Sequence, residues 1–190
     1  MPFVLVVVAL GVLASYARGG RLRRAAEAPL RWRSLLFLGV AVQIGVDALA
    51  AREVLGDATT LGWLLLLLSQ VLVVGFLVAN LHLPGVLLIA TGLLLNAVVM
   101  AANGAMPVDP AAIQALGLGD VEVQPGKHTL MDADTLLPWL ADILPLPPLR
   151  TIISAGDVVL AAGVIPLTHA LMSYRTPAER RRRRDVTDKT

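Results

Sequence analysis

Cysteine is absent from the 190 residues of the chain. Its absence excludes disulfides in any compartment, and it also excludes thiolate metal sites and thiol nucleophiles. The sequence shows no internal repeat and no linker that would separate two soluble modules. Charged residues make up 16% of the chain, whereas 56% is apolar and the mean hydropathy is +0.73. Soluble domains are roughly half apolar, so the composition indicates a membrane protein.

Five apolar runs alternate with polar segments, and each run predicts a transmembrane helix. A crossing helix needs about 20 residues. The runs are residues 2–17, 34–51, 61–79, 85–102 and 151–174. The first run lacks a basic segment before it, which argues against a signal peptide. The predicted fold class is therefore all-α: one polytopic membrane domain over residues 1–190, a bundle of about five helices with a small extracytoplasmic lid over residues 103–150.

The basic residues are distributed unevenly between the two predicted sides of the membrane. Six lie between the first two runs and seven lie in the tail, residues 175–190. The opposite side holds three, which are Arg52, Lys127 and Arg150. Lys and Arg accumulate on the cytoplasmic side of membrane proteins. The sequence therefore predicts a bacterial plasma membrane protein with its N-terminus outside and its C-terminus in the cytoplasm.

The arginine-rich inner face has two interpretations. One is a topological signal that also attracts anionic lipid headgroups. The other is a nucleic-acid tail formed by the five-arginine run at residues 180–184. No aromatic residue is interleaved in that run to stack on bases. We therefore expect membrane lipids as partners and no nucleic acid.

Polar side chains within the apolar runs are candidates for a functional site. Asp47, Asn96 and Asp157 fall at a similar depth below the predicted outer surface, and Gln43 lies one turn from Asp47 on the same face. Placing a charged side chain inside the bilayer costs roughly several kcal/mol, so an acidic residue within a membrane span is by default a candidate functional residue. One interpretation is a polar chamber that opens to the outside. The alternative is that these groups satisfy one another and hold the helices in register.

The lid carries several local signals. Asp109 and Pro110, with Gly117 beyond them, predict a short helix with an N-cap, a first-turn proline and a glycine stop. Residues 136–144 predict a short amphipathic helix that lies flat on the outer leaflet, with Trp139 at headgroup level. Prolines then stiffen the return to the last helix.

Metal and nucleophile chemistry has weak support in the sequence. His128, Asp132 and Asp134 have a spacing that could ligate a metal, but no second histidine is nearby, and a solvated polar turn is the better interpretation. Ser154 has no histidine and acid that the sequence places around it. We therefore predict no metal and no cofactor.

Four motifs resemble an uncharacterised bacterial membrane family, domain of unknown function 5317. They are Asn-Gly-Ala-Met-Pro-Val at residues 103–108, Lys-His at 127–128, Ala-Asp-Ile-Leu-Pro-Leu-Pro at 141–147 and Ser-Ala-Gly-Asp-Val-Val-Leu at 154–160. The resemblance covers nearly the whole chain and implies a topology without an activity. Its motif residues Asn103, His128 and Asp142 join Asp47, Asn96 and Asp157 as candidate binding residues.

A fainter resemblance concerns lipoprotein signal peptidase, a membrane aspartyl protease. Residues 154–163 are similar to its last helix, and residues 103–105 are similar to its Asn-x-Gly-Ala stretch. The resemblance implies that Asp157 corresponds to one catalytic aspartate. The second aspartate should follow in an Asn-x-x-Asp pattern, but Ala97, Val98 and Val99 follow Asn96. Asp47 could replace it only if the second predicted helix packs beside the last one.

Two functional hypotheses follow. The first is a non-enzymatic membrane component that binds a lipid, a peptide or another membrane subunit at an outward-facing polar chamber. The second is a membrane-embedded aspartyl hydrolase that uses Asp157 and Asp47. The sequence leans toward the first, and it leaves the oligomeric state open.

Overall fold

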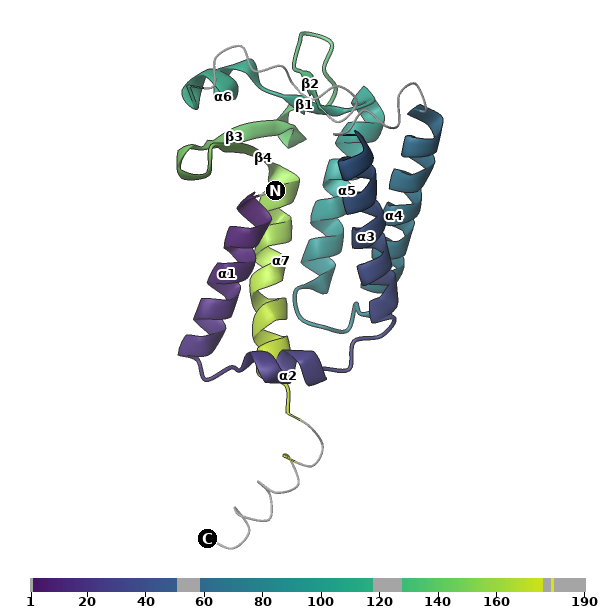
Figure 1. Ribbon diagram of the computed structural model, residues 1–190. Helices are drawn as coiled ribbons and strands as arrows, with labels where there is room; N and C mark the ends of the chain where they lie inside the picture. The colour runs from purple at the N-terminus through teal and green to yellow at the C-terminus, as the bar shows by residue number, and fades with distance from the viewer. Residues whose placement is uncertain (1, 51–58, 118–127, 176–178, 180–190) are drawn as a thin grey trace, which may run out of the picture. The chain divides into compact units, whose positions relative to one another are not determined.

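The computed structural model describes residues 2–50, 59–117, 128–175 and 179 (Figure 1). The chain divides into two compact units, which we describe separately. The larger unit comprises Met1–Ala28 and Pro84–Thr190, and the smaller unit comprises Pro29–Leu83. Two predictions fall on residues outside the described ones, namely the five-arginine run at 180–184 and the outer residues Arg52 and Lys127.

Helix α7 is the central element of the larger unit. It packs against α5 along one side and against α1 along another, and α2 contacts its C-terminal end (Figure 1). The helices are α1 (Pro2–Ala17), α2 (Leu22–Glu27), α5 (Val86–Asn103), α6 (Pro110–Ala115) and α7 (Ala155–Met172). Every other large helix of this unit is therefore positioned by its contact with α7.

Glycines allow α5 and α7 to approach until their backbones touch. A Cβ atom on Gly163 would lie 2.5 Å from the Gly85 carbonyl oxygen and 2.8 Å from the Ile89 nitrogen. The same contact recurs at Gly92, seven residues after Gly85, and Gly156, seven residues before Gly163. A Cβ on Gly92 would collide with the Gly156 carbonyl oxygen. Because small residues let helix backbones come close without lipid or side chains between them, this contact sets the spacing of the helix pair.

A four-stranded mixed sheet lies at the N-terminal end of α7 (Figure 1). Its strands are β1 (Met106–Val108), β2 (His128–Leu130), β3 (Asp142–Leu146) and β4 (Thr151–Ser154), in the order β2-β1-β3-β4. Strand β1 pairs in parallel with β2 and β3, and β3 pairs antiparallel with β4. Two 3-10 turns, η1 (Pro138–Leu140) and η2 (Pro147–Leu149), flank β3.

A small apolar core joins the sheet to the helix pair. Val99 of α5, Met106 of β1 and Leu140 of η1 are buried together. Ala155, the first residue of α7, packs against them. The sheet is therefore fixed to the ends of both helices.

The smaller unit is a helix pair, α3 (Arg33–Ala50) and α4 (Thr59–Ala79). Ser69 donates a hydrogen bond to the Gly39 carbonyl at 3.0 Å across the pair. Asn80 is fully buried, and it donates to the carbonyls of Arg31 and Phe76 while it accepts from the Arg31 N–H. These bonds hold the segment before α3 against the end of α4.

The structure corrects the predicted all-α class, because the region predicted as a lid contains the sheet. Two of its strands contain proline, and parallel partners are separated by 20 residues or more, so no local pattern reveals the pairing. The last predicted span was also too long, since Thr151–Ser154 is strand β4 and α7 begins at Ala155.

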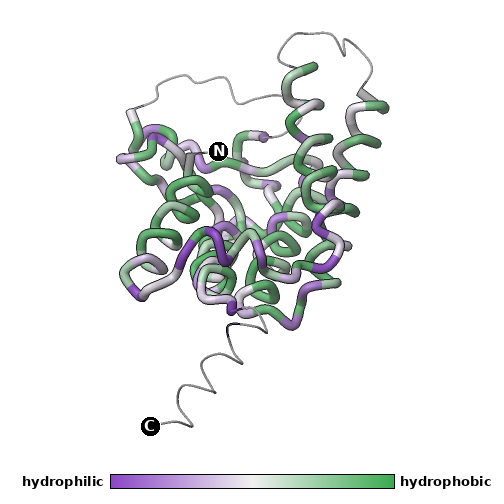
Figure 2. Tube along the Cα trace, turned by 60° about the horizontal axis from the view of Figure 1, so that its bottom comes forward, coloured by the Kyte–Doolittle hydropathy of each residue, from purple (hydrophilic) through white to green (hydrophobic). Residues whose placement is uncertain are grey.

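The prediction of about five transmembrane helices is wrong as well. Within the described residues, two helices are long and apolar enough to cross a membrane, α5 and α7. The other apolar stretches, Phe3–Ala17, Arg33–Val46 and Leu67–Ala79, are shorter. A helix of 16 residues such as α1 extends about 24 Å, against about 30 Å of hydrocarbon. Figure 2 shows that hydrophobic residues dominate the helices, with hydrophilic residues gathered mainly in the connections.

Local signals within the lid had mixed outcomes. The helix predicted after Asp109 is confirmed as α6, where the Asp109 side chain accepts a hydrogen bond from the Ala111 N–H at 2.8 Å. The amphipathic helix predicted for residues 136–144 is wrong, because this stretch forms η1 and the start of β3. Leu137, with a φ of 54°, turns the chain where that helix was expected.

We expect Gly163→Ala to lower the thermal unfolding midpoint of the detergent-solubilised protein. The added methyl meets the backbone of α5, which cannot move aside as a side chain can, and overpacking of this kind costs about 1–3 kcal/mol. Gly45→Ala is the matched control, because a Cβ there has nothing within 4 Å. Equal midpoints for the two variants would contradict the close helix contact.

Candidate functional site

Ser154 and Asp157 organise the N-terminus of α7. The Ser154 hydroxyl accepts a hydrogen bond from the Asp157 N–H at 3.0 Å, and Asp157 Oδ2 accepts one from the Ser154 N–H at 3.2 Å. The two residues thus form a capping box, which satisfies backbone donors at the helix start. Since α7 begins at Ala155, Asp157 lies in the first turn of the helix, nearer to the helix start than the sequence predicted.

Asn96 connects this cap to α5. Its amide nitrogen donates to Asp157 Oδ1 at 2.9 Å, and its oxygen accepts from the Ser154 hydroxyl at 2.8 Å. A Cβ on Gly156 would collide with the Asn96 side-chain oxygen and lie 2.8 Å from its Cγ. The glycine therefore makes the space in which Asn96 reaches both cap residues.

Asp142 reaches the same cluster from the sheet. It begins β3, where it pairs with Ser154 of β4, and its side chain is only 10% exposed. Burial raises the pKa of Asp142 from 3.8 to about 7, and the charge of Asp157 adds to the shift. Two carboxyl groups from different elements therefore interact at this end of α7.

His128, the first residue of the edge strand β2, is the last member of the cluster. Its Nε2 lies 3.9 Å from Asp142 Oδ2, and its side chain is 38% exposed. The sheet produces this approach, because β1 pairs at Met106 with His128 and at Val108 with Asp142. We call Asn96, His128, Asp142, Ser154 and Asp157 the carboxylate cluster.

The structure thus brings together four of the six candidate binding residues, Asn96, His128, Asp142 and Asp157. Asn103 has a different role, because its amide donates to the carbonyls of Val99 and Leu136 and accepts from the Leu136 N–H. Asp47 belongs to α3 of the smaller unit, and its side chain lies outside the described residues.

Ser154 was missed as a member of the cluster. The sequence contained a signal for it, since a serine three residues before an acid and ahead of an apolar run indicates a capping box. Asp132, weighed as a metal ligand, instead closes its own turn with Thr135. Within the part of the chain that the structure describes, no group of three His, Asp or Glu residues could hold a metal ion.

The cluster can exchange a proton or accept a positive charge. Both carboxylate oxygens of Asp157 accept hydrogen bonds, one from Asn96 and one from the Ser154 N–H. Asp142 holds a proton near neutral pH because it is desolvated beside another carboxylate. Asp157 and Asn96 are only partly buried, so part of the cluster is exposed beside the helix pair.

Comparison with known proteins identifies a family of unknown function. A family model described as a family of unknown function, DUF5317, matches residues 27–168. No curated protein and no solved structure matches the chain. The matched region includes every residue of the carboxylate cluster.

The raised pKa of Asp142 predicts a pH-dependent stability. The carboxyl ionises near 3.8 when unfolded and near 7 when folded, so the folded protein binds more protons between these values. The free energy of unfolding should therefore fall by a few kcal/mol as the pH rises from about 4 to about 7. Thermal unfolding across this range measures the effect.

The neutral variant Asp142→Asn should lack this pH dependence of the free energy of unfolding. It should be more stable than wild type near pH 7, because it has no buried carboxyl group to ionise. Asp134→Asn, which removes an exposed acid of the same segment, is the control and should keep the wild-type profile. Parallel pH profiles for wild type and Asp142→Asn would show that Asp142 ionises normally in the folded protein.

Proposed function

This chain belongs to the family of unknown function DUF5317, and we propose that it is a membrane protein in which α5 and α7 cross the bilayer. Each helix has 18 residues and extends about 27 Å, close to the hydrocarbon thickness. Only three residues of each are buried: Val86, Gly92 and Val99 in α5, and Gly156, Gly163 and Met172 in α7. A core helix of a soluble protein would be mostly buried, so the exposed apolar surface supports contact with lipid.

The distribution of charge supports an orientation for this helix pair. Arginines of α2 lie at the C-terminal end of α7, because the Arg21 N–H donates to the Met172 carbonyl at 2.9 Å. The sheet lies at the opposite end (Figure 1). Arginine-rich segments stay on the cytoplasmic side. We therefore place the sheet and the N-terminus outside and the C-terminal tail inside, in the plasma membrane of a bacterium.

We infer that the carboxylate cluster binds a positively charged group of a membrane ligand. The observation that carries this inference is the buried Asp142 carboxyl beside Asp157. A buried carboxylate is stable only when it is paired or protonated. Among the described residues, no lysine or arginine forms an ion pair with either acid. An ammonium group could replace the proton on Asp142 and pair with both acids, which fits a lipid headgroup and also a lysine of a peptide or subunit.

Peptide hydrolysis is the second candidate, with Asp142 in the place that the sequence assigned to Asp47. A carboxyl pair cleaves peptides when one member holds a proton while the other activates water. Asp142 holds a proton beside Asp157, which favours this function. Each oxygen of Asp157 accepts one hydrogen bond and keeps a second lone pair, which is all that pairing with a cation requires, whereas hydrolysis also requires a positioned water and a peptide carbonyl between the two acids. Binding without catalysis is therefore the better-supported function.

Native mass spectrometry of the protein extracted with its own lipids tests the two functions. We expect a stoichiometric ligand on the wild type and about tenfold lower occupancy on Asp142→Asn, because one of the two charged partners is lost. Asp134→Asn should retain the ligand. Its acid is exposed and lies outside the carboxylate cluster.

The same spectra distinguish the alternatives. A bare wild type, with a larger precursor trapped only on Asp142→Asn, would support hydrolysis and contradict the binding function. Equal ligand occupancy on all three proteins would exclude the carboxylate cluster as the binding site.

A further inference from the structure

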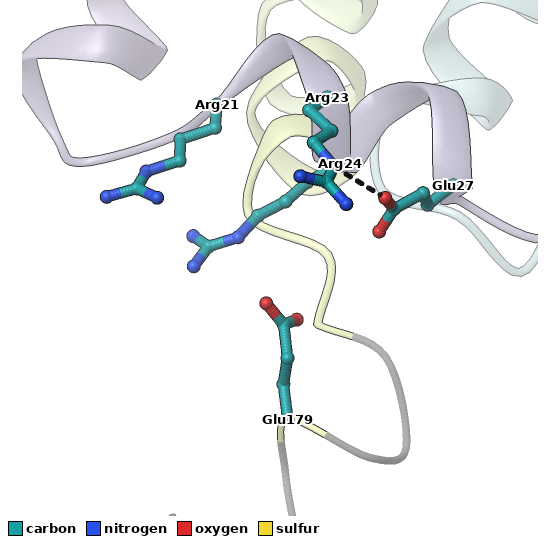
Figure 3. Close-up of a pocket in the computed structure, with 5 residues that line it drawn as sticks. All are labelled: Arg21, Arg23, Arg24, Glu27 and Glu179. Carbon is teal, nitrogen blue, oxygen red and sulfur yellow. Dashed lines mark hydrogen bonds and ion pairs between the residues drawn. The ribbon is translucent and has the colours of Figure 1, made fainter.

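A cavity of about 440 Å³ opens beside α2, at the opposite end of α7 from the carboxylate cluster. It is lined by Arg21, Arg23, Arg24, Glu27 and Glu179 (Figure 3). Its volume lies in the range of small-ligand pockets. Three arginines against two glutamates leave a net positive charge in a small space.

The arginines are held in place by the turn between α1 and α2. The Gly20 N–H donates to the Ser15 carbonyl at 2.8 Å, and the Arg21 N–H donates to the Met172 carbonyl at 2.9 Å. A Cβ on Gly20 would lie 2.9 Å from the Ser15 oxygen and 3.1 Å from the Met172 side chain. The start of α2 is therefore fixed tightly against the end of α7.

The side chains divide into two groups. Arg23 donates to Glu27 at 3.0 Å, four residues along α2, so its charge is already compensated. Arg21 is the extended N-cap residue just before α2, and Arg24 lies within the helix, three residues further along the chain. Figure 3 shows that these two extend to the same side, that the carboxylate of Glu179 points toward them, and that Arg23 turns toward Glu27.

We propose that this cavity binds a phosphate group, which Arg21, just before α2, and Arg24, within α2, hold together. A guanidinium presents a planar fork of donors that matches phosphate oxygens and forms charge-assisted hydrogen bonds with them. Glu179 enters the cavity from the C-terminal segment as a tethered carboxylate, and the phosphate, with its greater charge, displaces it. This proposal is independent of the carboxylate cluster.

The phosphate can come from a lipid headgroup or from a soluble compound. Leu22, between Arg21 and Arg23, is 52% exposed, and Tyr16 at the end of α1 is 48% exposed. An apolar and an aromatic side chain beside arginines are typical of the membrane interface. A lipid phosphate is therefore the source that the structure favours.

The test titrates the full-length protein in neutral detergent with two probes, phosphatidic acid and inorganic phosphate, and follows the thermal unfolding midpoint. We expect a saturable rise with phosphatidic acid, about tenfold weaker binding for Arg24→Gln, and several-fold tighter binding for Glu179→Gln, which removes the competing charge. Arg33→Gln is the matched control, since Arg33 is exposed in the same basic stretch of the sequence but does not line the cavity. Its affinity should equal that of the wild type.

Arg24→Lys is a second variant for the case that Arg24→Gln fails to fold. It keeps the positive charge but loses the planar set of guanidinium donors, so we expect an affinity between those of the wild type and Arg24→Gln. A response to phosphatidic acid alone identifies a lipid phosphate, and an equal response to inorganic phosphate identifies a soluble one. Equal losses in Arg24→Gln and Arg33→Gln, or no response to either probe, would overturn the proposal. Asp142→Asn should respond as wild type does, which separates this site from the outer one.

Discussion

The backbone contact between α5 and α7 is the constraint on which the rest of the larger unit depends. Gly92 of α5 and Gly85, the N-cap residue of α5, face Gly156 and Gly163 of α7, and the two glycines of each pair are seven positions apart in the sequence. At this distance the helices leave no room for a methyl group between them. Packing of this kind does not rely on the hydrophobic effect, so it can hold two apolar helices together in lipid.

The close contact also creates the polar chemistry at the end of the helix pair where the sheet attaches. Asn96 occupies the space over Gly156 and reaches the cap of α7, which a wider spacing would put beyond hydrogen-bond distance. The cap leads directly into β4, and β4 places Ser154 opposite Asp142. One helix contact thus determines where the sheet attaches and which two carboxyl groups meet. The burial that raises the pKa of Asp142 results from that attachment.

The two ends of α7 carry opposite charge and are built differently. At its N-terminal end, acids are drawn together by the sheet and held by hydrogen bonds. At its C-terminal end, arginines project from α2, and a tight glycine turn fixes that helix. This separation agrees with the uneven distribution of basic residues along the sequence. It is the basis for the proposals of an outer cation site and an inner phosphate site.

The sequence by itself determined the apolar helices and the helix after Asp109, and it marked Asn96 and Asp157 as candidate site residues, because periodicity, capping residues and polar groups in apolar runs are local signals. It could not reveal the sheet, because two of its short strands contain proline and its parallel strands pair across 20 residues or more. It offered Asp47 as a partner for Asp157, which stays a prediction. Only the tertiary structure revealed that Asp142 lies near Asp157, because strand register brings distant residues together, and register depends on contacts that no local pattern encodes.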